Sequence, residues 1–201
     1  TQKNTEAEEK WALKREEQEK RTKKNKFIKF MELINKVRFI TLWIFIVPFI
    51  AINTCLYIAT HAHDFISSKY WLFNAFPYFD GQASISRVTR FFPNYLIFKP
   101  AMFLTSFLLV KYWFYNREII KSIDSNHKYI KKFFFFGIAS AVMLTLHSIF
   151  LGIKFDYAIY KLFRRIVLLS FIIFEVIAQT YLVLTFNSLK DKLSKYINIR
   201  V

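Results

Sequence analysis

Four long apolar segments alternate with charged segments along this chain. The first covers residues 39–59 and contains no charged side chain, and three more of the same length cover residues 95–115, 133–153 and 166–186. A helix of about 20 apolar residues spans the hydrocarbon core of a bilayer. Because lipid offers no hydrogen-bond partners, a helix is the structure that satisfies the backbone of each segment internally. The pattern therefore predicts an all-α integral membrane protein with four transmembrane helices.

The residues before the first span predict a helix of another kind. In its charged part, Glu16 precedes Lys20 and Glu17 precedes Arg21 by four positions, the favourable order for ion pairs on a helix. From Phe27 onward, apolar side chains share one helical face, which indicates an amphipathic segment at the membrane surface. We therefore expect a charged and amphipathic arm over residues 1–38, a four-span bundle over 39–186 and a basic tail over 187–201.

A solvent-facing helix as long as this arm has little to stabilise it alone. We therefore hypothesise that it contacts a neighbouring subunit; a helix that is stable by itself is the alternative. The apolar residues available for such a contact are Trp11, Leu13, Phe27, Phe30 and Ile34.

The distribution of Lys and Arg predicts the orientation of the spans. They number 12 in residues 1–38, six in loop 111–132 and four in the tail 187–201, against three in loop 60–94 and four in loop 154–165. Loops rich in Lys and Arg stay on the cytoplasmic side of a membrane. Both termini should therefore lie on the cytoplasmic or matrix side, with loops 60–94 and 154–165 on the other.

The composition supports a membrane protein. Apolar residues make up 54% of the 201 residues, whereas soluble domains contain about 45–50% even with glycine counted. The many Phe, Tyr, Ile, Asn and Lys residues have AT-rich codons, which favours a mitochondrial or bacterial inner membrane over an endomembrane. The first apolar span begins too far from the start for a secretory signal, and the arm is too acidic for a presequence.

The net charge of +16 suggests the kind of partner. Because the basic residues flank apolar segments, anionic phospholipids or acidic subunits are the expected counter-charges, and nucleic acid is not. Lys99, one turn inside the second span, can extend its ammonium to the headgroups. The residues expected to contact lipid headgroups are Arg87, Arg90, Lys99, Arg164 and Arg165.

The candidate chemistry inside the membrane rests on Glu175. Gln179 follows it by four positions and faces the same side of the fourth span, and His147 in the third span could lie at a comparable depth and pair with it. An ionisable residue within the bilayer is a functional hypothesis by default, here a proton or cation carrier. The alternative is a structural hydrogen bond between the third and fourth spans, or to a neighbouring subunit.

The sequence contains no recognisable catalytic constellation. His61, His63 and Asp64 are possible metal ligands, but no further motif completes a coordination sphere, and Cys55 is the single cysteine. A second membrane-embedded histidine for haem ligation is also absent. We therefore expect no metal, no cofactor and no enzyme activity.

Residues 77–113 resemble the first lumenal loop and second span of the damage-regulated autophagy modulator and post-GPI-attachment membrane protein superfamily. The resemblance rests on Pro77-Tyr78, Ile85-Ser86, Thr89, Pro93, Ile97-Phe98, Met102 and Leu108. Arg87-Val88-Thr89 stands where that family has Asp-Thr-Gly, and the family usually has about six spans. The resemblance implies a lumenal loop 60–94 and a role in lipid handling or membrane organisation.

Three functions follow as expectations. The first is a non-catalytic accessory subunit of a larger membrane complex, for example of a respiratory type, that stabilises assembly through its spans and its arm. The second is a stand-alone lipid-handling protein of the superfamily just named. The third is a small proton or ion carrier that uses Glu175.

Overall fold

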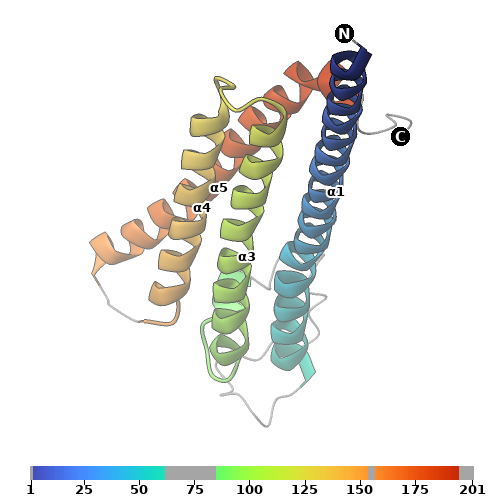
Figure 1. Cartoon of the computed structure of the whole chain (residues 1–201). Coiled ribbons are helices and arrows are strands. Elements are labelled where there is room, and N and C mark those ends of the chain that lie inside the picture. Colours follow the sequence, from blue (N-terminus) through green and yellow to red (C-terminus); the bar gives the residue numbers. More distant parts are fainter. Residues whose placement is uncertain (1, 62–84, 154–156, 195–201) are drawn as a thin grey trace.

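The computed structural model describes the backbone of residues 2–61, 85–153 and 157–194, with side chains for residues 11, 13–22, 24–61, 87–153 and 157–194. In this part of the chain the structure is helical and contains no strand. The helices are α1 (Gln2–His61), α2 (Ile85–Val88), α3 (Asn94–Ile123), α4 (Ile130–Phe150), α5 (Ala158–Ser188) and α6 (Lys190–Ser194) (Figure 1). Four of them, α1, α3, α4 and α5, are long and apolar enough to cross a membrane, which confirms the all-α class and the number of long apolar helices.

The long helices pack in the order in which they occur along the chain. α3 lies between α1 and α4, and α5 packs on α4 and crosses obliquely behind α4 and α3 in this view, so that its end lies near α1 (Figure 1). Consecutive long helices run antiparallel, so the start of α4 and the ends of α3 and α5 lie at one end of the bundle. The end of α1, α2 and the start of α5 lie at the other end.

The predicted arm and the predicted first span form one unbroken helix. α1 has 60 residues and runs through the boundary expected near residue 38. No proline or glycine occurs before Pro48, so nothing in the sequence interrupts the backbone hydrogen bonds. Among the described ion pairs, Lys20 Nζ lies 2.7 Å from Glu16 and Lys36 Nζ lies 2.5 Å from Glu32, each one turn apart on the exposed surface.

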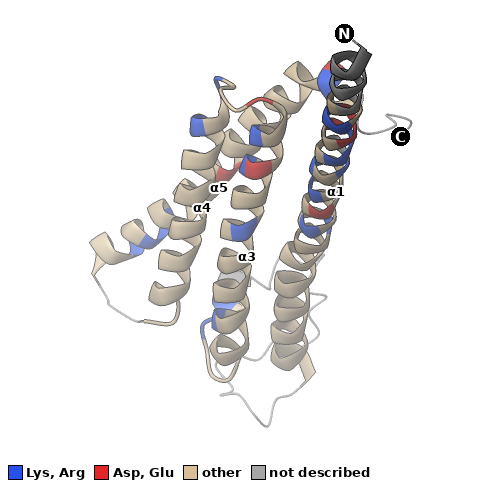
Figure 2. Cartoon of the chain, viewed as in Figure 1, with Lys and Arg blue, Asp and Glu red and all other residues tan. Residues whose placement is uncertain are grey.

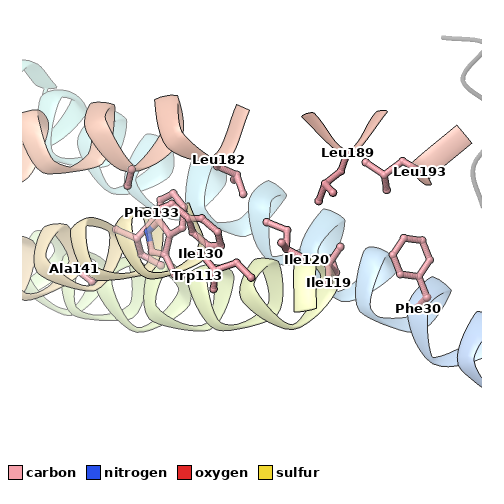
Figure 3. Close-up of a cluster of buried hydrophobic side chains, with 12 residues drawn as sticks. Phe30, Trp113, Ile119, Ile120, Ile130, Phe133, Ala141, Leu182, Leu189 and Leu193 are labelled. Carbon is pink, nitrogen blue, oxygen red and sulfur yellow. The ribbon is translucent and has the colours of Figure 1, made fainter. Parts of the chain in front are cut away.

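One hydrophobic cluster joins the helices at the end where α1 enters the bundle. Trp113 and Phe133 are fully buried between α3 and α4, and the cluster extends along Ile119 and Ile120 to Phe30 on α1 (Figure 3). Leu182, Leu189 and Leu193 add the end of α5 and α6.

The amphipathic segment of α1 is therefore placed differently from the expectation. Phe30 is 4% exposed, and Ile34 and Val37 pack against the same cluster, so this face lies against the protein rather than on a lipid surface. Phe27 and Met31 lie at the margin of the contact and are exposed. The helical periodicity identified the apolar face, but not the surface that covers it.

A second hydrophobic cluster closes the opposite end of the bundle. The Asn94 side chain at the start of α3 donates hydrogen bonds to the carbonyl oxygens of Cys55 (2.8 Å) and Val88 (3.0 Å), which joins α1, α2 and α3. Phe91, Phe98 and Leu151 are buried around this contact. Both ends of the bundle are thus fixed by buried contacts, and the long helices connect them.

Candidate functional site

The polar centre of the bundle is the carboxylate of Glu175, near the middle of α5. The Ser140 hydroxyl on α4 donates to its Oε2 at 2.6 Å, and Gln179 Nε2, one turn further along α5, donates to its Oε1 at 2.9 Å. The expected proximity of Glu175 and Gln179 is therefore present. The structure adds a hydrogen bond from the neighbouring helix.

Ser140 is the site residue that sequence reasoning missed. It belongs to a row of small buried residues on α4, which consists of Gly137, Ser140, Ala141 and Ser148. Small residues at helical spacing allow two membrane helices to approach closely, and hydroxyls among them can hydrogen bond across the contact. The helical spacing of these small residues could have indicated from the sequence that Ser140 contacts Glu175.

His147 does not pair with Glu175. It lies two turns after Ser140 on α4, about 10 Å further along the helix axis, and the charges that act on it are those of Arg164 and Arg90. Because Glu175 lies level with Ser140, from which it accepts a hydrogen bond, and His147 lies two turns further along α4, the histidine–glutamate pair considered from the sequence is not formed.

Further polar contacts join α3 to the same region. Ser106 Oγ on α3 lies 2.8 Å from the carbonyl oxygen of Ala141 and 2.6 Å from Thr145 Oγ1, both on α4. The Tyr112 side chain, also on α3, interacts with Gln179. The polar side chains in the middle of the bundle thus link α3, α4 and α5 to one another.

This arrangement is suited to holding helices together. It contains one carboxylate surrounded by hydroxyl and amide groups, and within the described ranges no group of three or more His, Cys, Asp and Glu side chains could hold a metal ion. Of the possible ligand cluster at residues 61–64, only His61 belongs to the described part of the chain.

The basic residues at the far end of the bundle converge from three segments. Lys99 Nζ on α3 lies 3.4 Å from the carbonyl oxygen of Ile149, and the Arg164 guanidinium on α5 lies 5.9 Å from the centre of the Tyr160 ring. Partial desolvation, followed by the charge of Arg164, lowers the pKa of Arg90 in the segment before α3.

Of the five residues expected to contact headgroups, the structure therefore brings Arg90, Lys99 and Arg164 to one place. Arg87 and Arg165 are exposed at the same end. The Arg164 Nε atom is buried and has no hydrogen-bond partner within the described part of the chain.

The residues expected to bind a partner through the arm fall into two groups. Phe30 and Ile34 pack inside the bundle, whereas Trp11 and Leu13 are 63% and 67% exposed and Phe27 is 42% exposed. Every side chain that the structure describes between Trp11 and Lys29 is exposed. The exposed apolar side chains of the arm thus include Trp11, Leu13, Phe27, Ile28 and Met31.

Comparisons with protein-family models, with curated proteins and with solved structures find no match to this chain. In residues 77–113, for which a resemblance to the autophagy modulator superfamily was considered from the sequence, Phe98 and Met102 are core residues of α3, and residues 77–84 lie outside the described part.

Proposed function

We propose that this chain is a multi-pass integral membrane protein that acts as a non-catalytic accessory subunit of a larger membrane assembly. In this proposal α1, α3, α4 and α5 span the bilayer. The arm of α1, the α3–α4 turn and α6 lie on the cytoplasmic or matrix side. The arm of α1 binds other membrane subunits, and anionic phospholipids contact the basic residues at the two ends of the bundle.

The outward faces of the long helices support insertion into a membrane. Phe45, Phe135 and Val183 lie on three different helices and are 65%, 68% and 64% exposed. Soluble monomers rarely expose contiguous apolar patches larger than a few hundred Å². Charged residues gather toward the ends of the long helices and on the arm, and most of the intervening helix surface carries none (Figure 2). α4 has 21 residues, which is about 30 Å of helix and matches the hydrocarbon thickness.

The observation that carries the accessory role is the unsupported arm. α1 begins at Gln2, well before Phe30, which is the first buried residue among its described side chains, and the described side chains from Trp11 to Lys29 are all exposed. An isolated helical segment of this kind gains little stability in water. A neighbouring subunit that covers Trp11 and Leu13 supplies the missing contact.

The polar interior supports a non-catalytic role. Glu175 and Ser106 both take part in hydrogen bonds between helices. Polar side chains used in this way hold membrane helices in register. A proton or cation carrier would require Glu175 to release Ser140 and Gln179 and to bind a proton or a cation instead. The hydrogen bond from Ser140 to Glu175 favours a structural link between α4 and α5.

Purification from native membranes in a mild detergent tests the proposal. We expect other membrane subunits to co-purify in fixed ratio, and the double variant Trp11→Ala, Leu13→Ala to lose them by at least tenfold. Thr22→Ala with Lys24→Ala, on the same exposed part of the helix, is the matched control and should retain them. A wild-type preparation that contains this chain and no other protein would overturn the accessory role.

The convergence of Arg90, Lys99 and Arg164 favours lipid handling as a second candidate function. An arginine with a buried unpartnered nitrogen is suited to an anionic phosphate group. Mass analysis of lipids in the same preparation tests this idea, because Arg164→Gln should reduce bound anionic lipid several-fold while Arg165→Gln should not. Equal lipid content in both variants would contradict it.

A further inference from the structure

Glu175 lies at the edge of a shallow hollow on the outer surface of α5. The hollow has a volume of about 420 Å³ and is lined by Glu175, Val176, Gln179, Thr180, Val183 and Leu184. A carboxylate can accept about four hydrogen bonds, and two donors are recorded here, Ser140 and Gln179. The residues that the structure describes provide no ion pair for Glu175, so its charge is open to a partner from outside.

Lys111 presents the opposite charge on another face of the bundle. Its side chain is exposed on α3, and the ammonium lies 4.6 Å from the centre of the Phe107 ring. Phe107 and Phe114, which flank it on the same outward face, are also exposed. No ion pair links Lys111 to any residue in the described ranges.

The helix contacts place the two charges at the same depth. Trp113 on α3 lies against Gly137 on α4, and Ser106 on α3 lies against Ala141, so the antiparallel register puts Lys111 level with residues 138–139. Glu175 lies level with Ser140, to which it is hydrogen bonded. Lys111 and Glu175 therefore both lie beside the middle of α4, which covers Ile130–Phe150.

Lys111 lies about one turn inside the expected end of the second span, but its ammonium is directed toward Phe107, one turn deeper along α3 and away from the nearer headgroups. The basic residues at the start of α4, Lys131 and Lys132, lie about 10 Å nearer the membrane surface, at 1.5 Å per residue. An ionisable side chain buried in hydrocarbon is costly unless it is paired. Each of these two residues therefore needs a counter-charge that its own chain does not provide within the described ranges.

We propose that copies of this chain pack side by side in the membrane, with Lys111 of one copy paired with Glu175 of the next. This inference rests on the proposed membrane-spanning arrangement. When two copies are inserted in the same orientation, Lys111 of one copy and Glu175 of the next lie at the same depth in the membrane and can form an ion pair. The contact joins α3 of one copy to α5 of another and is therefore heterologous, which generates a ring or a row rather than a two-fold dimer.

Co-purification of two differently tagged copies from the same membranes tests the contact. We expect the wild-type copies to co-purify, and Glu175→Gln or Lys111→Gln to reduce recovery of the second copy by at least tenfold. Lys111→Arg keeps the charge and should retain the association. The double exchange Lys111→Glu, Glu175→Lys restores opposite charges and should recover it.

Lys111→Gln is the variant that tests the contact without disturbing the fold. Glu175→Gln also alters the bond to Ser140, whereas the Lys111 ammonium lies against the exposed Phe107 ring and forms no ion pair within the described ranges. Failure of wild-type copies to co-purify, or undiminished co-purification of the Lys111→Gln variant, would overturn the proposal.

Two further outcomes separate this inference from the proposed function. A complex with other subunits that contains one copy of this chain overturns the inference alone. Release of the chain from membranes by alkaline carbonate overturns the membrane arrangement on which both depend.

Discussion

Small residues set the distances between the helices. Gly137 on α4 lies directly against the indole ring of Trp113 on α3, and a Cβ atom at this position would overlap the ring. Ser140 and Ala141, about one turn further, have no exposed surface and take part in contacts with α5 and α3. The close approach of α4 to α3 and α5 thus depends on the small side chains of Ser140 and Ala141 and on the absence of a side chain at Gly137.

Gly137→Ala should destabilise the bundle, because the added methyl group cannot fit unless Trp113 moves. Overpacking of this kind costs about 1–3 kcal/mol. Thermal unfolding in detergent micelles measures the effect, with Val142→Leu on the exposed face of the same helix as the control. An unchanged unfolding midpoint for Gly137→Ala would mean that α3 and α4 are not in close contact.

At the scale of elements, α1 combines two environments in one helix. The side chains that the structure describes from Trp11 to Lys29 are exposed, and the helix packs on α3 from Phe30 onward. The transition lies where Phe30 meets Ile119, Ile120 and Leu193, so this contact fixes the direction in which the arm leaves the bundle (Figure 3).

Phe30→Ala should loosen this contact, since replacing a buried Phe by Ala costs about 3–5 kcal/mol in soluble cores. Hydrogen exchange of the amides of residues 24–38 should accelerate. Phe27→Ala provides the matched control, because Phe27 is the same residue type three positions earlier and is exposed. Similar exchange in the two variants would show that Phe30 does not anchor α1.

At the scale of the whole molecule, the structure places the arm of α1, the α3–α4 turn and α6 at one end of the bundle. Phe30, Ile120 and Leu193 meet there in one cluster. Basic residues occur at both ends, and the acidic residues within the described ranges, apart from Glu175, lie on the arm or at the end where the arm enters (Figure 2).

In sealed vesicles, single cysteines at Lys24 and Lys128 should react with a membrane-impermeant maleimide from the same side, and a cysteine at Lys161 from the opposite side. All three positions are exposed. The native Cys55 is fully buried and serves as the unlabelled background. Labelling of positions 24 and 161 from the same side would rule out the proposed topology.

Some features of the site could be predicted from sequence and others could not. The pairing of Glu175 with Gln179 follows from their spacing on one helix, because residues four apart are neighbours on a helix surface. The choice of Ser140 rather than His147 as the partner of Glu175 depends on how α4 is rotated toward α5. α4 is apolar on nearly all sides, so its pattern does not indicate which face turns inward.

The sequence by itself determined the helical class, the number of long apolar helices and the separation of charged from apolar segments. These follow from length and composition within single segments, because each helix forms its own backbone hydrogen bonds. Only the tertiary structure decided that the arm and first span form one helix with Phe30 inside the bundle. It also decided that Trp113 packs on Gly137, and that Lys111 on α3 and Glu175 on α5 lie at one level along the bundle. These features depend on the register and rotation of neighbouring helices, which are set by side-chain packing between segments far apart in the chain.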